Sequence, residues 1–392
     1  MYEDIGKQLI RQGARGINNS PEQSLRILKR GIILIPDESV AWYNYGLALH
    51  CTGRIKSAIR AYKQAINSKN VQLDPIVNNL AQDLLLDKNF KEGWELYEHR
   101  LKRVDLDFRL YIELFGEAWK GEGDKREFDT LIVVSEQGYG DTFQFCRFIT
   151  LLEERGLNVQ FFCQEEVKNF LREWSSIKNI KNTIHKDGDK YLWCPLMSLP
   201  SRLGINNKNV PYKQGYFSVE NTRYEKWRKI LHKKAGTKLV ALHWQGNKSF
   251  EKRLYSKNRS IEFRYLNMLS DIDGYEFIAI QKGEARNQMA KECDLSICKG
   301  QSEFDTTMDF RDTAAVLANC DLLISADSSV VHLAGGMGIP VWVMLSYVPE
   351  WRWGTEGEKS YWYQSVRLFR QNSANDWKET INRIRKEMQK GI

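Results

Sequence analysis

The sequence contains no uninterrupted hydrophobic run long enough to cross a membrane. Its most apolar stretch, residues 314–345, is broken by Asp321, Asp327 and a glycine pair, whereas a spanning helix needs about 20 consecutive apolar residues. The first residues, MYEDIGKQLIRQG, carry early acidic side chains and no apolar core of signal-peptide length. We therefore expect no transmembrane segment and a cytoplasmic location.

Cysteines are few, and they lack the spacing of metal or disulfide sites. The seven cysteines are an odd number and lie scattered along the chain, without a CxxC pair or a His/Cys cluster spaced for zinc. Several stand inside apolar runs, which is typical of reduced thiols in a core. We expect neither a disulfide framework nor a bound metal.

The charge balance is basic but has no concentrated block. The chain has 58 Lys and Arg residues against 50 Asp and Glu residues, which gives a net charge of +8. These charges occur in mixed-sign stretches such as residues 88–103, and such stretches usually form solvated faces. We therefore expect no nucleic-acid partner, and the positive surplus also suits the phosphates of a small ligand.

What remains is a globular protein of two or three domains, since its 392 residues are 42% hydrophobic and 28% charged. Residues 1–103 carry a repeated helical pattern, clearest over residues 39–70, with weaker copies on both sides. Three such units are about the minimum that buries a continuous core. The central unit resembles a tetratricopeptide repeat in the residues Trp42, Tyr45, Gly46, Leu49, Gly53, Ala58, Tyr62 and Ala65.

A generic helical cap with coincidental spacing is the alternative reading of residues 1–103, and it is equally all-α. The pattern also leaves two roles open for these helices. They either bind a peptide or protein partner or simply cover the rest of the chain.

Residues 104–392 have the pattern of an α/β protein. Short apolar runs rich in β-branched residues alternate with helix-like segments, which predicts parallel sheets covered by helices on both faces. Residues 204–238 are poor in strand signals and divide this part into two Rossmann-like domains, 104–218 and 219–392. A final helix is expected near residues 375–390. The predicted strands are residues 130–135, 159–163, 239–244, 276–281, 322–327 and 341–345.

Ligands of such sheets bind outside the carboxyl ends of the strands, so the loops there are the candidate sites. The first loop, SEQGYGD, has Gly138 and Gly140, which allow a tight turn or the close approach of a ligand, here the donor, to the backbone. Asp141 follows at the helix start. Its carboxylate has two equally weighted interpretations, an N-cap of the helix or a general base.

The second loop follows the run at residues 239–244 and is rich in cations. Trp244, Gly246 and Asn247 precede Lys248, and Arg259 lies further on. Cationic and N–H donors of this kind suit a diphosphate. The alternative for each cation is a solvated basic loop.

The third loop combines a helix start with small residues. Asp327, Ser328 and Ser329 lead into a helix expected to begin at about Ser329, and a helix N-terminus attracts anions. His332 lies one turn in, where a hydrogen-bonded role inside the protein is favoured over a catalytic one.

Two further stretches could contribute to a nucleotide site. If the phosphates bind at Ser328 and Ser329, topology places the nucleoside end near Gln281 and Lys282. The aromatic stretch at residues 351–365 either packs in a core or forms a platform for a sugar.

These motifs together resemble those of a known family. EQGYGD with FQFCRF, ALHWQGN with NRS, the stretch DTAAVLANCDLLISADSSVVHLAGGMGIPVWVML, PEWRW and SYWYQSVRLFRQ occur in the expected order over about residues 78–371. They look like bacterial tetratricopeptide-repeat glycosyltransferases of the heptosyltransferase-like group. The resemblance implies a GT-B pair of Rossmann-like domains, nucleotide-diphosphate sugar donors and catalysis without a metal or other cofactor.

The resemblance also implies roles for single residues. Asp141 falls where heptosyltransferases carry a catalytic aspartate. The turn Asp327–Ser329 is similar to the family's Asp-Thr-Gly-like turn, which binds the donor diphosphate through its backbone, and Ser329 replaces the glycine. The helical repeats are similar in architecture to those of protein O-glycosylating transferases, in which the repeats bind polypeptide acceptors.

The expected protein is thus a hexosyl- or heptosyl-transferring enzyme, with an all-α, TPR-like solenoid followed by a GT-B pair. It would act on a saccharide, lipid-linked or protein acceptor and invert the anomeric centre, because one base and no nucleophile are evident. The main alternative is a partner-binding protein with a degenerate transferase domain. A nucleotide-sugar epimerase is a third possibility, but it usually needs a second carboxylate, which the sequence does not place.

Overall fold

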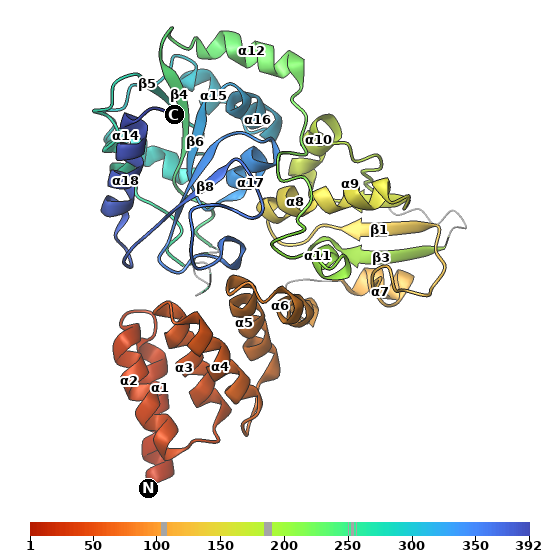
Figure 1. Ribbon diagram of the computed structural model, residues 1–392, viewed down its shortest axis with the longest axis vertical. Helices are drawn as coiled ribbons and strands as arrows, with labels where there is room; N and C mark the ends of the chain where they lie inside the picture. Colours follow the sequence, from red (N-terminus) through yellow and green to blue (C-terminus); the bar gives the residue numbers. More distant parts are fainter. Residues whose placement is uncertain (103–107, 184–189, 250, 252–254, 256) are drawn as a thin grey trace. The chain divides into compact units, whose positions relative to one another are not determined.

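The computed structural model describes residues 1–102, 108–183, 190–249, 251, 255 and 257–392. Its chain divides into two compact units (Figure 1). Unit 1 comprises Met1–Phe108, Gly204–Asn206 and Val348–Glu356, and unit 2 comprises Arg109–Leu203, Asn207–Tyr347 and Gly357–Ile392. The predicted boundary between residues 103 and 104 lies outside the described residues.

Unit 1 is all-helical in its N-terminal part, as the sequence predicted. Each helix packs against the next one along the chain. A residue without a side chain stands where α3 and α4 cross, since a Cβ added to Gly46 would lie 2.4 Å from the Tyr62 ring. The elements are α1 (Tyr2–Gly16), α2 (Pro21–Leu34), α3 (Ser39–Cys51), α4 (Ile55–Ile66), α5 (Leu73–Leu86), α6 (Phe90–Tyr97) and the 3-10 helix η1 (Glu98–Lys102).

Two short segments from far along the sequence complete the core of unit 1. The 3-10 helix η6 (Trp351–Trp353) packs on α5, and the ring of Trp351 meets the Trp94 ring edge-on at 5.3 Å between centroids. The indole N–H of Trp94 donates to the Ile205 carbonyl at 2.8 Å. Buried aromatic rings with a satisfied N–H are strong packing anchors, and the sequence did not predict this arrangement.

The first half of unit 2 is built on a parallel three-stranded sheet of order β2-β1-β3. Strand β1 is buried at every position, because helices cover both faces of the sheet. The elements are α7 (Arg109–Phe115), β1 (Thr130–Val134), α8 (Tyr139–Phe145), α9 (Arg147–Glu154), β2 (Val159–Phe162), α10 (Glu165–Trp174), β3 (Tyr191–Pro195), η2 (Leu196–Ser198) and α11 (Leu199–Arg202).

The second half of unit 2 has a five-stranded parallel sheet of order β5-β4-β6-β7-β8. Its first three strands and the C-terminal helix share one apolar core. The elements are α12 (Asn221–Leu231), β4 (Lys238–His243), α13 (Phe263–Asn267), β5 (Tyr275–Ala279), η5 (Glu284–Arg286), α14 (Asn287–Lys291), α15 (Gln301–Asp305), α16 (Phe310–Ala318), β6 (Leu322–Ala326), α17 (Ser329–Gly336), β7 (Val341–Leu345), β8 (Val366–Arg370) and α18 (Trp377–Gln389).

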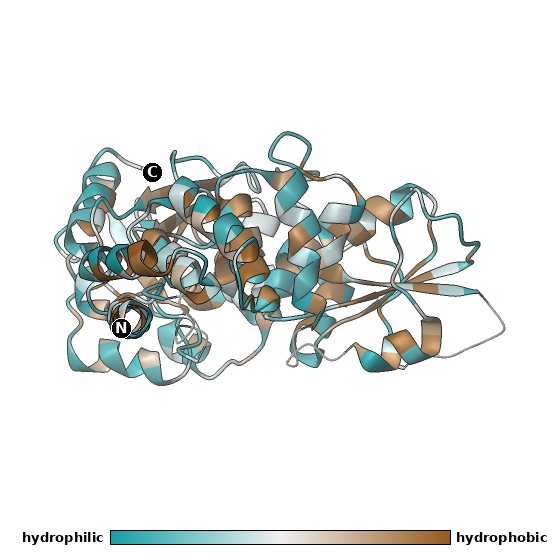
Figure 2. Cartoon of the chain, turned by 90° about the horizontal axis from the view of Figure 1, so that it is seen from below, coloured by the Kyte–Doolittle hydropathy of each residue, from teal (hydrophilic) through white to brown (hydrophobic). Residues whose placement is uncertain are grey.

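The predicted fold class is therefore confirmed: an all-α N-terminal part precedes two Rossmann-like, parallel-sheet halves. Figure 2 shows helices on which hydrophobic and hydrophilic residues alternate, as expected for helices that cover a core on one side. The two sheets lie within the predicted domains 104–218 and 219–392, and both belong to one compact unit. Among the described residues, no helix is both long and apolar enough to span a bilayer.

Candidate functional site

Each sheet of unit 2 reverses its direction of winding at one place. The chain runs from β1 to one neighbour and then to the other, and in the second sheet β5 and β6 lie on opposite sides of β4. Ligands of doubly wound sheets bind at the carboxyl ends of the strands next to such a reversal. The reversals select the loops after β1, β4 and β6, which are three of the loops singled out from the sequence.

The loop after β1 leads directly into α8. Gly138 occupies the N-cap position, and Asp141 stands at the third helical position, where its Oδ2 accepts a hydrogen bond from the Gly138 N–H at 2.9 Å. Asp141 itself is thus not the N-cap residue that one interpretation of the sequence made it. Its carboxylate nevertheless performs a capping function, because it accepts the N-cap N–H as the N3 side chain of a capping box does, and its negative charge lies at a positive helix end.

Gly140, at the start of α8, stands where a side chain would not fit. A Cβ at this position would lie 3.0 Å from Cδ2 of His332 and 3.2 Å from Cα of Ser329. The first turn of α8 is therefore in direct contact with the first turn of α17. The sequence suggested that a ligand approaches this backbone closely, whereas the structure shows a close approach of another helix. This contact places the Asp141 segment beside the N-terminus of α17.

The loop after β6 forms the start of α17 as predicted. The helix begins at Ser329, and Ser328 holds the N-cap position. The Ser328 hydroxyl forms no cap bond to the helix. It lies 3.1 Å from Nδ1 of His243 and 3.4 Å from the Ser325 hydroxyl instead. A helix end of this kind presents backbone N–H groups and partial positive charge to an anion.

His243 is a site residue that the sequence analysis missed. It ends β4 and faces Ser325 of β6 in the sheet register. Burial lowers the pKa of His243 to about 4, so the imidazole is neutral near pH 7 and supports the Ser328 hydroxyl without adding charge. The available signal was a single polar side chain at the end of an otherwise apolar strand.

One cation approaches the same turn. Nη1 of Arg259 lies 3.8 Å from Oδ2 of the buried Asp327, and Nε of Arg259 is buried without a hydrogen-bond partner among the described residues. Gly246 lies beside this turn, with its Cβ position 4.0 Å from the Asp327 carbonyl oxygen. Arg259, Gly246, Asp327 and Ser328 are thus brought together as the sequence analysis expected.

The remaining residues of the loop after β4 have local roles. The side-chain oxygen of Asn247 accepts hydrogen bonds from the N–H and the hydroxyl of Ser249, at 3.0 and 2.8 Å. Lys248 is exposed in the same turn. Two other cations of this loop, Lys252 and Arg253, lie outside the described residues, and a third, Lys257, is half-buried.

The side chains of three predicted donor-binding residues are engaged inside the protein. The Trp244 ring is fully buried against Phe263, because it continues the apolar face of β4. The Gln281 side chain accepts from the backbone N–H groups of Trp244 and Gln245 at 3.1 and 2.8 Å, so it fixes the loop that begins there. Lys282 donates to the Phe304 carbonyl and lies over its ring, and desolvation lowers its pKa.

His332 and the aromatic stretch also face inward. Nδ1 of the buried His332 lies 2.9 Å from the Tyr363 hydroxyl, which agrees with the favoured role of a hydrogen-bonded internal residue. Trp351, Trp353 and Trp362 are likewise buried. The packing interpretation of residues 351–365 is confirmed for these rings, and they form no exposed sugar platform.

A buried carboxylate was also missed in the loop after β1. Oε1 of Glu136 accepts a hydrogen bond from the Met197 N–H at 3.1 Å, which ties this loop to the end of β3. The motif SEQGYGD contained the residue, but its burial could not be read from the sequence.

Among the described residues, no group of three or more His, Cys, Asp or Glu side chains is arranged to hold a metal. Sugar transfer without a metal stays a prediction.

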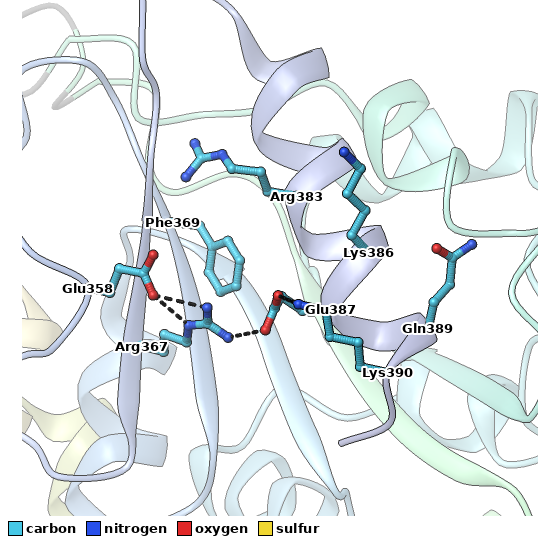
Figure 3. Close-up of a pocket in the computed structure, with 8 residues that line it drawn as sticks. All are labelled: Glu358, Arg367, Phe369, Arg383, Lys386, Glu387, Gln389 and Lys390. Carbon is cyan, nitrogen blue, oxygen red and sulfur yellow. Dashed lines mark hydrogen bonds and ion pairs between the residues drawn. The ribbon is translucent and has the colours of Figure 1, made fainter.

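A pocket of about 450 Å³ opens elsewhere, between β8 and α18 (Figure 3). Its central cation, Arg367, is paired with Glu358 and Glu387, and Lys390 also pairs with Glu387. None of the residues that line this pocket comes from the loops at the sheet reversals, so the pocket is a weaker candidate for the functional site than the start of α17.

The known proteins similar to this chain share little sequence identity with it. No model of a known protein family matches the chain. Protein FlbA of Caulobacter vibrioides is 24% identical over 389 residues, which cover 92% of this chain and 63% of FlbA. The chain thus spans less than two thirds of the length of this relative.

Solved structures similar to the chain include several glycosyltransferases. A family 9 glycosyl transferase from Veillonella parvula is 11% identical, with 68% of this chain and 90% of that chain covered and a TM-score of 0.44. The E. coli ADP-heptose lipopolysaccharide heptosyltransferase II is 10% identical, with 67% and 98% covered and a TM-score of 0.43. A mutant O-GlcNAc transferase from Thermobaculum terrenum is 12% identical, with 100% and 93% covered and a TM-score of 0.27.

Proposed function

We propose that the chain is a glycosyltransferase that moves a hexosyl or heptosyl group from a nucleotide-diphosphate sugar to an acceptor hydroxyl. The acceptor is a saccharide, a lipid-linked glycan or a protein. The transfer needs no metal or other cofactor and inverts the anomeric centre. One observation carries this proposal: the loops at two sheet reversals lead into α8 and α17, and the first turns of these helices touch at Gly140 and Ser329.

In this proposal, the start of α17 binds the donor diphosphate. Backbone N–H groups of the first turn and the Ser328 hydroxyl donate to the phosphate oxygens, and Arg259 adds positive charge. Lys248, in the loop after β4, is a second cation at the edge of the sheet formed by the carboxyl ends of its strands. This arrangement stabilises the charge that develops on the diphosphate as its bond to C1 of the sugar breaks. Trp244, Gln281, Lys282 and His332 then support the site from within, and do not contact the ligand through their side chains.

Asp141 is the proposed general base. Its carboxylate takes the proton of the acceptor hydroxyl while the hydroxyl oxygen forms the new bond to C1. A single displacement of this kind inverts the configuration at C1, and NMR of the product tests it. Retained configuration would contradict the proposed role of Asp141.

The first experiment is calorimetric titration of UDP, GDP, ADP, CMP and dTDP into the protein without added metal. We expect one of these nucleotides to bind in the micromolar range and Ser328→Ala to weaken its binding. Ser302→Ala is the matched control, because Ser302 is an exposed serine of α15 that bonds to the adjacent Glu303. Binding that is unchanged in Ser328→Ala would remove the proposed diphosphate site, and no binding of any nucleotide would contradict the function itself.

The capping bond of Asp141 favours the second candidate function, a partner-binding protein whose transferase domain is degenerate. Asp141→Asn separates the two, since asparagine keeps an oxygen that accepts from the Gly138 N–H but cannot take a proton. For the enzyme, we expect transfer to fall by a factor on the order of 10²–10⁴ with nucleotide binding and melting temperature unchanged. Equal transfer rates in wild type and Asp141→Asn would refute the catalytic role.

A further inference from the structure

Arg147 is a fully buried cation at the start of α9, in the first half of unit 2. Its guanidinium donates through Nε to the Gln144 carbonyl at 2.8 Å and through Nη1 to the Trp362 carbonyl at 2.9 Å. Nη2 donates to the Tyr216 hydroxyl at 3.0 Å. These described partners are all uncharged, although a buried charge is costly unless its donors are satisfied.

Two aromatic rings complete the surroundings of Arg147. The guanidinium carbon lies 4.4 Å from the centroid of the Tyr216 ring and 4.6 Å from that of the Tyr363 ring. Contacts between a cation and an aromatic face strengthen when water is excluded. Tyr216 also donates from its hydroxyl to the Phe143 carbonyl at 2.7 Å, so this phenol both accepts and donates. Arg147 therefore joins a helix of the first half to the loop before β8 in the second half.

The contacts continue from Arg147 to the proposed active site. Tyr363, which stacks on Arg147, places its hydroxyl 2.9 Å from Nδ1 of His332. His332 in turn packs at the Cβ position of Gly140, the residue before Asp141. The same segment that carries Tyr216 is held to α17 by backbone bonds from the N–H groups of Tyr216 and Phe217 to the Gly336 carbonyl, at 2.7 and 2.9 Å.

We propose that Arg147, through Tyr363 and His332, is a positioning residue that holds the start of α8 against the start of α17 and so aligns Asp141 with the donor sugar. This rests on the proposed function. Arg147 contacts neither substrate. Arginine is required because its planar fork reaches four acceptors, the fourth being the Pro211 carbonyl at 3.4 Å from Nη1. Its faces also stack on aromatic rings, and a lysine ammonium offers neither geometry.

The test compares Arg147→Lys with wild type in two measurements. The first is hydrogen exchange of the amides of α8 and α17, which needs no substrate. We expect both helices to exchange roughly 10-fold faster in the variant, because their contact opens more often. Ile381→Ala is the matched control, since Ile381 is a fully buried residue of α18 and its loss destabilises unit 2 away from the α8–α17 contact.

The second measurement is the ratio of donor hydrolysis to transfer with the nucleotide sugar found for the wild type. This ratio does not depend on the fraction of folded enzyme. When the base and acceptor are misaligned with C1, water competes better, and we expect the ratio to rise by about 10-fold or more. The dissociation constant of the nucleoside diphosphate should remain within about twofold of the wild-type value. The proposed diphosphate site is the start of α17, and the whole of this helix belongs to the second half of unit 2, so binding does not require α8 to be in place.

Tyr363→Phe serves as a milder variant in case Arg147→Lys fails to fold, because it removes only the hydroxyl that meets His332. It should change both measurements in the same direction by a smaller factor. Wild-type exchange and a wild-type ratio in a folded variant, together with a melting-temperature loss like that of Ile381→Ala, would overturn the positioning role. Failure of the wild type to transfer or hydrolyse any nucleotide sugar would instead overturn the proposed function, and hydrogen exchange would still decide whether Arg147 holds the two helices together.

Discussion

Replacing Gly140 with alanine tests the contact on which the proposed site depends. An added Cβ would lie 3.2 Å from Cα of Ser329 and 3.0 Å from Cδ2 of His332. Ser329 Cα belongs to the backbone and cannot rotate away, so α8 and α17 must separate by a few tenths of an ångström. Overpacking of this kind costs about 1–3 kcal/mol, whereas alanine in place of a helical glycine gains about 0.5–1 kcal/mol.

The midpoints of these two ranges, about 2 and about 0.75 kcal/mol, give a net loss of about 1 kcal/mol in the free energy of unfolding for Gly140→Ala. Urea denaturation at pH 7 measures it. Gly123→Ala is the control, because no atom lies within 4 Å of the Cβ position at Gly123, and it should be nearly neutral. The rate of sugar transfer should fall by a larger factor than the folded fraction of the protein does, since the displaced helix carries Asp141. A Gly140→Ala protein that is as stable and as active as the wild type would refute the close approach of the two helices.

Three further changes test other parts of the structure. Gln281→Met leaves the buried backbone of Gln245 without its partner, so we expect a loss of about 1–3 kcal/mol for each unsatisfied group; a loss under about 1 kcal/mol in urea denaturation would contradict this role. The pKa of His243 is lowered by burial to about 4, so the unfolded chain binds the extra proton first as the pH falls below about 6.5. The wild type should therefore lose about 2 kcal/mol more than His243→Gln between pH 7 and pH 5, and parallel pH profiles of the two proteins would refute it. Gly46→Ala forces a Cβ to 2.4 Å from the buried Tyr62 ring and should destabilise unit 1 by about 1–3 kcal/mol, which an unchanged melting curve would contradict.

The alternation of apolar runs and helices was enough to predict most strands, because buried parallel strands are short and β-branched. β3 and β8 escaped this reasoning. The β3 sequence, YLWCP, ends in proline, and β8, VRLFR, carries two arginines, Arg367 and Arg370, among five residues. Their apolar side chains are buried through pairing with β1 and β7, which is a long-range property that a local pattern does not contain.

The loops of the site were predictable for a different reason. Parallel strands place all their carboxyl ends on one edge of a sheet, so the loops that carry Asp141 and Ser328 could each be selected from the topology of their own sheet. The direction of each side chain does not. Trp244 belongs to the core although it stands at the end of a strand, and Arg147 is buried although arginine is almost never fully buried unless it is paired. Only the packing of distant rings around that guanidinium explains its position.

The path of the chain limits how unit 1 can be recombined with other proteins. The polypeptide leaves the helical unit near residue 108, contributes Gly204–Asn206 to it, and returns once more at Val348–Glu356. Two strips of that unit's interior, including Trp351 against Trp94, are therefore encoded far downstream of its helices. The helices of unit 1 therefore cannot be exchanged as one contiguous segment, because a graft of the first 108 residues onto another protein would leave out Trp351, which packs against Trp94.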